Sequence, residues 1–202
     1  AQWALVLTLF WPVVRGMPFS MFRAYVGWHR GRGLVKETEF GLLAYIAAFP
    51  VYLLIALVVV LLMYLIAELT GQKTIPNASD RIVDMASGGV LQLVMVLLLG
   101  SVWAPIVEET VFRGAVFRFL RSRNGARSVW SFPLALVISS VAFALMHGYM
   151  VQQLILVGCL GAIFALMRES RGSILAPIAA HCAHNTLVFS LVFTLVAFGS
   201  DR

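Results

Sequence analysis

The sequence predicts an all-α protein, a polytopic transmembrane helical bundle with about six membrane segments in a single domain over residues 1–202. Three observations lead to this prediction. Hydrophobic residues make up 61% of the chain and charged residues only 12%, whereas soluble domains average about 45–50% apolar and roughly a quarter charged. The apolar residues form long stretches, and a helix needs about 20 of them to cross a bilayer. Arginines gather at the ends of these stretches, as in the loops that set membrane topology.

The first third of the chain predicts two membrane segments with a polar strip between them. Residues 1–14 lack the charged start and small-residue cleavage site of a signal peptide, so we interpret them as a truncated first span and expect further residues upstream. Residues 15–38 are basic and glycine-rich with aromatic side chains, which predicts an interfacial amphipathic juxtamembrane segment at the headgroup surface. Residues 39–69 predict a long span, in which Pro50 introduces a kink or marks the first turn.

The remaining apolar stretches predict the other membrane helices, at 88–104, 106–123, 130–147, 150–167 and 173–199. The polar stretch 70–87 is expected to be a loop with a short helix. Pro105 is expected to end one helix and begin the next, since proline favours the first turn of a helix. Residues 168–172 (RESRG) predict a tight loop, and Ser173 is the expected N-cap of the last helix.

The distribution of positive charge predicts the orientation in the membrane. If the spans alternate, one side holds twelve basic residues and the other holds three, namely Lys73, Arg81 and Arg202. The twelve are Arg15, Arg23, Arg30, Arg32, Lys36, Arg113, Arg118, Arg121, Arg123, Arg127, Arg168 and Arg171. Because cytoplasmic loops are enriched in Lys and Arg, we expect a protein of the cytoplasmic membrane whose basic loops and active-site opening face the cytoplasm.

The same distribution argues against some classes of partner and site. A net charge of +6 is compatible with nucleic-acid binding, but no basic run is interleaved with exposed aromatic residues, so we expect no nucleic-acid partner. Cys159 and Cys182 lie in apolar segments without a second Cys or His at zinc-site spacing, and we interpret them as small buried residues. Membrane lipid is the expected surrounding, and the oligomeric state stays open.

Few strongly polar side chains interrupt the later apolar helices, and their spacing is regular. They are Glu108, Glu109, Arg113, His147, His181, His184 and Asn185. A charged side chain in the bilayer centre costs about 3 kcal/mol, so intramembrane acids are functional-site candidates. Glu109 with Arg113, and His181 with Asn185, are four residues apart and share a helix face. We expect these groups, contributed by three helices, to line one cavity, with His184 in a packing or supporting role.

These residue types indicate hydrolysis of an amide bond inside the bilayer. A carboxylate and an imidazole can hold a water and remove its proton, which makes a nucleophile for a carbonyl. A second imidazole and a carboxamide can donate hydrogen bonds to the oxyanion that develops.

The same residues resemble the motifs of a known family. EETVFR (108–113), FALMH (143–147) and HCAHN (181–185) are similar to the E-E-x-x-x-R, F-x-x-x-H and H-x-x-x-N motifs of the CAAX protease and bacteriocin-processing family. This family is also called the Abi family or the type II CAAX prenyl endopeptidases. The three motifs occur in the family's order, and the resemblance covers roughly residues 90–190.

The resemblance implies a glutamate-dependent intramembrane endopeptidase for a membrane-associated peptide or protein, with or without a prenyl group. It implies that Glu108 is the main general base and that His147 helps to orient the water. Glu109 would be held by Arg113, and His181 with Asn185 would form the oxyanion site. This mechanism needs no metal or other cofactor, although a metal held by Glu108, His147 and His181 stays open.

Two other functions fit the composition. The first alternative is a non-catalytic membrane scaffold or immunity-type protein, in which the polar cluster only stabilises the bundle. The second is a proton-coupled transporter, against which the sequence shows neither inverted repeats nor paired broken helices. The peptidase hypothesis has one difficulty in depth: Ser131 to His147 is 16 steps, about 24 Å of helix. His147 is therefore expected at the far end of its helix, whereas Glu108 is expected nearer the cytoplasmic side.

Overall fold

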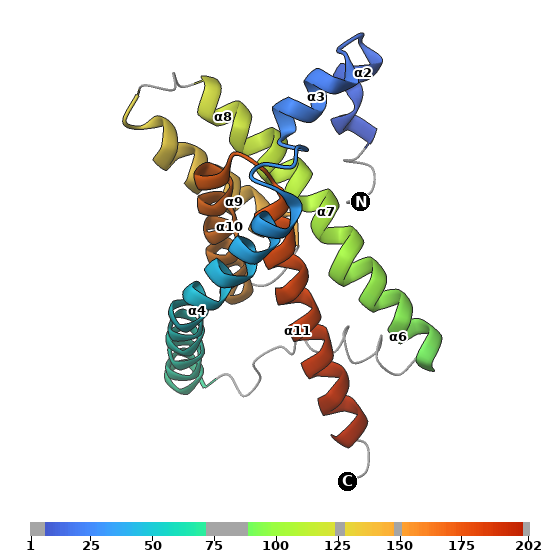
Figure 1. Ribbon diagram of the computed structural model, residues 1–202. Coiled ribbons are helices and arrows are strands. Elements are labelled where there is room, and N and C mark those ends of the chain that lie inside the picture. The colour runs from blue at the N-terminus through green and yellow to red at the C-terminus, as the bar shows by residue number, and fades with distance from the viewer. Residues whose placement is uncertain (1–6, 72–88, 124–127, 148–150, 200–202) are drawn as a thin grey trace.

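The computed structural model describes residues 7–71, 89–123, 128–147 and 151–199, and this part of the chain is helical without any strand (Figure 1). Four of its helices are long and apolar enough to cross a membrane: Leu34–Thr70, Val94–Arg123, Gln153–Arg171 and Leu175–Thr194. The apolar helix Ser131–Leu145 is shorter. The predicted all-α membrane fold is thus confirmed, and the chain is an integral membrane protein. The number of six membrane segments stays a prediction.

The elements follow one another as short N-terminal helices, one long isolated helix and then the bundle that carries the polar residues. Their bounds are α2 Trp11–Val14, α3 Phe19–Val26, α4 Leu34–Thr70, α6 Gly89–Leu98, η1 Leu99–Trp103, α7 Ala104–Glu109, η2 Thr110–Val116, α8 Phe117–Arg123, α9 Ser131–Leu145, α10 Val151–Arg171 and α11 Leu175–Gly199.

The helix break predicted at Pro105 is wrong. Elements α6, η1, α7, η2 and α8 follow without a gap and form one helix from Gly89 to Arg123, of which η1 and η2 are π-helical. Pro105 lies in the first turn of α7, directly after η1. A proline ring normally collides with the carbonyl four residues earlier. The wider π turn before Pro105 relieves that collision, so the helix continues.

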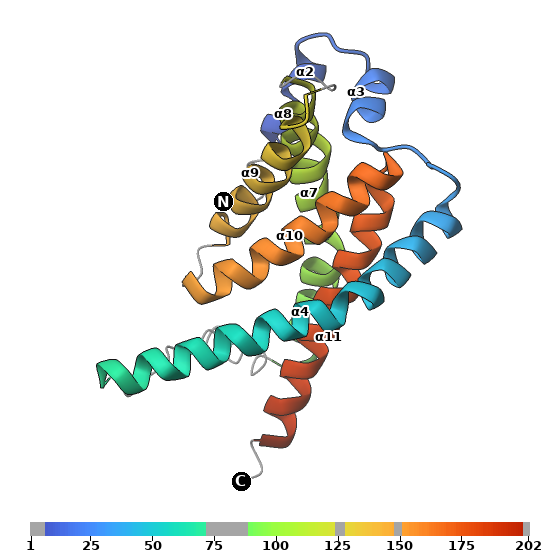
Figure 2. The same ribbon diagram turned by 90° about the vertical axis from the view of Figure 1, so that its left-hand side faces the viewer.

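The long helix α4 is confirmed where residues 39–69 predict a span, but it begins earlier, at Leu34, and Pro50 lies in its interior. It packs against α10 and α11 and then leaves them, as Figure 2 shows. Only 6% of its most apolar window is buried. An apolar helix with so little protein cover is a helix whose surroundings are lipid.

The segment 15–38 is packed onto the bundle more closely than an interfacial segment requires. Trp28 donates its Nε1–H to Oγ1 of Thr110 at 2.9 Å. At the junction between α10 and α11, Ser173 donates to the carbonyl of His29 at 3.0 Å, and the N–H of Ile174 bonds to Gly27. Gly27 has φ 87°, a left-handed conformation that glycine adopts without strain.

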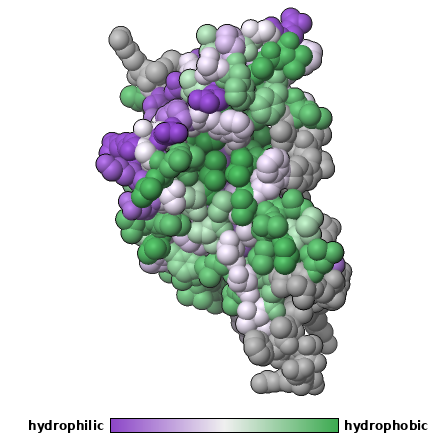
Figure 3. Space-filling model, turned by 45° about the vertical axis from the view of Figure 1, so that its right-hand side comes forward, coloured by the Kyte–Doolittle hydropathy of each residue, from purple (hydrophilic) through white to green (hydrophobic). Residues whose placement is uncertain are grey.

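The end of the bundle where α10 meets α11 is also held by charge pairs. Arg171 donates two hydrogen bonds to the buried Glu37 at the start of α4, at 2.8 and 3.0 Å, and Arg121 pairs with Glu169. The hydrophilic surface in Figure 3 gathers toward this end, and hydrophobic surface covers much of the rest of the visible face. Arg113, grouped above with the loop cations, is instead inside the bundle and 0% exposed.

The remaining predicted boundaries differ by a few residues or lie outside the described part. Helix α11 begins at Leu175. Ser173 therefore lies two residues before it, where its Oγ accepts the N–H of Leu175 at 3.2 Å. Of the predicted first span 1–14, residues 1–6 lie outside the described residues, and the rest includes only the short α2. The predicted loop 70–87 lies outside them from residue 72 on.

Candidate active site

The two adjacent glutamates end α7 and lie between the two π-helical stretches. Glu108 is 6% exposed and Glu109 is 0% exposed. Successive residues of a helix point about 100° apart, so the two carboxylates face different neighbours. π-helical turns within α-helices occur frequently at functional sites, because they change the direction of the side chains that follow.

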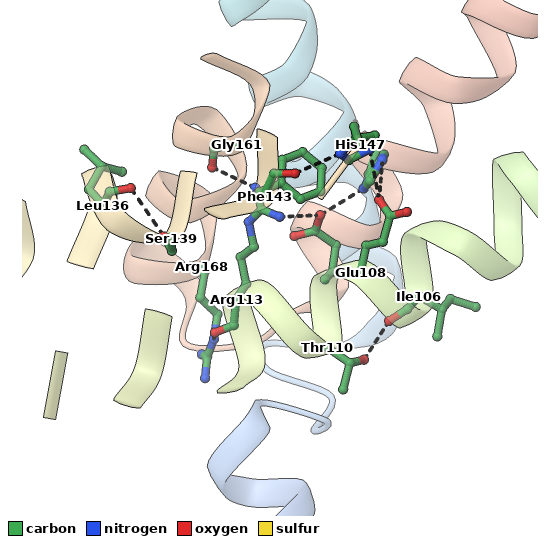
Figure 4. Close-up of polar contacts among 12 residues, drawn as sticks. Ile106, Glu108, Thr110, Arg113, Leu136, Ser139, Phe143, His147, Gly161 and Arg168 are labelled. Atoms are coloured by element: carbon green, nitrogen blue, oxygen red, sulfur yellow. Dashed lines mark hydrogen bonds and ion pairs between the residues drawn. The ribbon is translucent and has the colours of Figure 1, made fainter. Parts of the chain in front are cut away.

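Glu109 is enclosed by partners of opposite charge (Figure 4). Its Oε1 accepts a hydrogen bond from Nη1 of Arg113 at 3.1 Å and lies 2.9 Å from Nδ1 of His181. Arg113 also donates from Nη2 to the carbonyl of Gly161 at 2.9 Å, and its guanidinium lies over the ring of Phe143. Buried charges are tolerated when they are paired and hydrogen-bonded. Glu109 and Arg113 therefore join helix 89–123 to α10 and α11.

Glu108 faces two imidazole rings from two other helices. Its Oε2 lies 3.8 Å from Nε2 of His147 and 3.7 Å from Nε2 of His181. Both separations exceed the usual hydrogen-bond length. Polar atoms at such separations are commonly bridged by a water molecule, and here one water would contact a carboxylate and two ring nitrogens.

The hydrogen bonds of the two rings determine which nitrogen faces Glu108. Nδ1 of His147 lies 2.8 Å from the carbonyl oxygen of Phe143, which only accepts, so this Nδ1 carries hydrogen. Nδ1 of His181 faces the carboxylate of Glu109 and carries hydrogen for the same reason. Nε2 of each ring is therefore the atom turned to Glu108. The ring of Phe164 stacks on His181 at 4.9 Å between ring centres and limits its rotation.

The structure thus brings five of the six predicted site residues into one connected cluster. They are Glu108, Glu109, Arg113, His147 and His181. Asn185 lies one turn further along α11, and its Nδ2 donates to the carbonyl of Gly100 in η1 at 2.8 Å. His184 faces α4, where its Nδ1 lies 3.0 Å from the hydroxyl of Tyr45, in the packing role expected for it.

Two contributors on α10 were missed by the sequence reasoning. Gly161 supplies a carbonyl to Arg113, and Phe164 stacks on His181. A methyl group on Gly161 would lie 3.1 Å from Cα of Ser140 on α9 and 3.3 Å from Nη2 of Arg113. The sequence signal is weak, because glycine and phenylalanine are common in membrane helices and a carbonyl donated by the backbone leaves no trace in residue type.

The cluster does not have the arrangement of a metal centre in the part of the chain described. Among residues 7–71, 89–123, 128–147 and 151–199, no group of three or more His, Cys, Asp or Glu side chains is placed to hold a metal ion. The site instead presents one carboxylate opposite two oriented imidazoles, an arrangement suited to holding and deprotonating water.

Comparison with known proteins gives matches over this same region. Residues 90–187, which include all six predicted site residues, match the family model described as Type II CAAX prenyl endopeptidase Rce1-like. Over 100 residues the chain is 33% identical to a protein of Bacillus subtilis (strain 168) named "Putative membrane peptidase YdiL". That alignment covers 49% of this chain and 38% of the length of the relative. No solved structure matches the chain.

Proposed function

Through residues 90–187 this chain belongs to the Rce1-like family of type II CAAX prenyl endopeptidases, and we propose that it is an intramembrane endopeptidase. Its substrate would be a membrane-associated peptide or protein, and the reaction would be hydrolysis of a peptide bond by water that Glu108 activates. The observation that carries the proposal is the position of Glu108 between two imidazoles, each of which turns Nε2 toward it.

The different partners of the two rings assign them different tasks. Nδ1 of His147 donates to a neutral carbonyl, which suits a neutral ring whose Nε2 accepts a hydrogen bond from the water. Nδ1 of His181 donates to the carboxylate of Glu109, which suits a protonated ring whose Nε2–H can donate to an oxyanion. With His181 protonated, the charges of Glu108, Glu109, Arg113 and His181 sum to zero, which favours their burial.

The reaction then balances without a further group. Glu108 takes a proton from water while the water oxygen bonds to the substrate carbonyl carbon, and the electron pair of the carbonyl moves to its oxygen. His181 stabilises that oxyanion, a contribution of about 3–4 kcal/mol for a well-placed donor. The carbon–nitrogen bond then breaks, and Glu108 returns the proton to the leaving nitrogen. The products are a carboxylate and an amine.

The proposal extends to location and substrate. We propose that the protein lies in the cytoplasmic membrane with its basic end toward the cytoplasm, which the gathering of charged residues at the junction of α10 and α11 supports. The family description makes a prenylated C-terminus the first substrate to test. The match covers only part of the relative's length, so substrate choice is a proposal about this chain alone.

The test is cleavage of quenched peptides by the protein in liposomes, with prenylated and unmodified peptides, each with and without a chelator. The Glu108→Gln variant carries the decisive change, and Glu68→Gln, on the exposed part of α4, is the matched control. We expect cleavage by wild type and by Glu68→Gln, and a loss of at least about 100-fold in Glu108→Gln. Equal cleavage by both variants would overturn the proposal. If folded wild-type protein cleaves no peptide, the scaffold alternative is favoured.

A further inference from the structure

The π-helical stretch before the glutamates leaves one backbone carbonyl without its usual partner. Hydrogen bonds in a π-helix run from an N–H to the carbonyl five residues earlier. The N–H of Ala104 follows this register and bonds to the carbonyl of Leu99. The next N–H in the register would belong to residue 105 and would bond to Gly100. Residue 105 is a proline and has no N–H.

A side chain from another helix supplies the missing donor. Nδ2 of Asn185 on α11 donates to the carbonyl of Gly100 at 2.8 Å. The two helices approach closely here, because a methyl group on Gly100 would lie 2.6 Å from Cε2 of Phe189 on α11. Glycine at position 100 thus leaves room for α11, and the asparagine amide satisfies the carbonyl that the proline leaves free.

The same helix α11 carries His181, one turn before Asn185, and His181 contacts both glutamates. The amide of Asn185 therefore grips helix 89–123 at Gly100, and the imidazole of His181 meets it at Glu108 and Glu109, about two helical turns further on. Two contacts between the same pair of helices fix both the rotation and the axial position of one against the other.

We infer that Asn185 is a positioning residue: it replaces the backbone donor that Pro105 lacks, and so holds the helix of Glu108 and Glu109 in register with His181. This inference rests on the proposed function and changes one role in it, because Asn185 then acts on the helix backbone and not on the oxyanion. A misplacement of reacting groups by about 1 Å costs on the order of 100-fold in rate.

The test restores the missing backbone donor. Asn185→Leu removes the amide and keeps a similar volume, and Pro105→Ala provides an N–H at position 105. We expect Asn185→Leu to lower kcat about 100-fold with KM little changed. The double variant Asn185→Leu/Pro105→Ala should recover at least about 10-fold, since the N–H of Ala at position 105 can now bond to Gly100. A hydrogen bond to an oxyanion would not be restored by that N–H.

The matched control is Asn185→Leu/Pro50→Ala, which removes a proline from the interior of α4 and should recover nothing. Absence of recovery in Asn185→Leu/Pro105→Ala would overturn the inference, and so would full activity of Asn185→Leu. If wild type cleaves no peptide, the proposed function fails separately, and the melting temperatures of the same variants still decide the inference. It predicts that Pro105→Ala reverses part of the decrease caused by Asn185→Leu, whereas additive changes would contradict it.

Discussion

Glu109 accepts the Nδ1–H of His181 at 2.9 Å, and this one contact separates the tasks of two glutamates that are adjacent in the chain. It uses one nitrogen of His181 on Glu109 and leaves the other nitrogen 3.7 Å from Glu108. Glu109 is also paired with Arg113 and is fully buried, whereas Glu108 faces ring nitrogens beyond direct hydrogen-bond reach. One glutamate is thereby placed to hold the helices together and the other to act on water.

The first prediction concerns Glu109→Gln. The substitution removes the negative partner of Arg113, whose guanidinium is fully buried. Removing one partner of a buried pair costs about 3–5 kcal/mol, because the other charge stays buried without compensation. We expect a decrease of that size in the free energy of unfolding, measured by denaturant titration in detergent.

Glu169→Gln is the matched control for that measurement. Glu169 also pairs with an arginine, Arg121 at 2.6 Å, but its side chain is 35% exposed. An exposed pair contributes about 0–1 kcal/mol. Equal losses in the two variants would contradict the structural role assigned to Glu109.

A second prediction compares two glycines on α10. The methyl group of Gly161→Ala would press on Ser140 at 3.1 Å and on Arg113 at 3.3 Å, whereas that of Gly158→Ala would meet only Ala144, at 3.8 Å. We expect Gly161→Ala to lower both the melting temperature and the peptidase rate, because α9 is displaced and the carbonyl that binds Arg113 moves. Gly158→Ala should leave both unchanged or raise stability slightly. The prediction is wrong if the two variants behave alike.

A third prediction concerns the contact of the N-terminal segment with the catalytic helix. Trp28→Phe removes the hydrogen bond to Thr110, one residue after Glu109, and should lower the free energy of unfolding by about 1 kcal/mol. Trp130→Phe is the control, because Trp130 is 67% exposed and the loss there should be near zero. A segment that only rests on the headgroup surface would show no difference between the two variants.

Much of the site was predictable because its chemistry is local in sequence. Spacing by four placed Glu109 beside Arg113, and the cost of charge in a bilayer implied that the acids meet the histidines of other helices. The clustering of Glu108, Glu109, Arg113, His147 and His181 follows that expectation. The catalytic roles of these residues stay predictions.

The difficulty with depth disappears once the helix of the glutamates is measured to its end. Glu108 lies 15 steps before Arg123, about 22 Å of helix, and His147 lies 16 steps after Ser131, about 24 Å. The helix that enters the short connection at 124–130 and the helix that leaves it thus carry their functional groups to nearly equal depth. The sequence reasoning treated Arg113 as the edge of a basic loop, and this moved Glu108 too close to the membrane surface.

Other features depend on contacts between residues far apart in the sequence and had no local signal. Pro105 usually ends a helix, yet here the helix continues, with π geometry before it and the amide of Asn185 on Gly100. The carbonyl of Gly161 binds Arg113 from 48 residues away. Such partners are fixed by how helices pack and not by the residue types along one helix.

The measurement that tests the central claim most directly is made on Glu108→Gln, with cleavage rate and melting temperature taken from one preparation. Glutamine keeps the size of the side chain but cannot take a proton from water. The account predicts a loss of at least about 100-fold in cleavage with no decrease in melting temperature, because Glu108 is placed for chemistry. Cleavage at the wild-type rate would contradict it, and so would a loss of cleavage that only follows a large decrease in melting temperature.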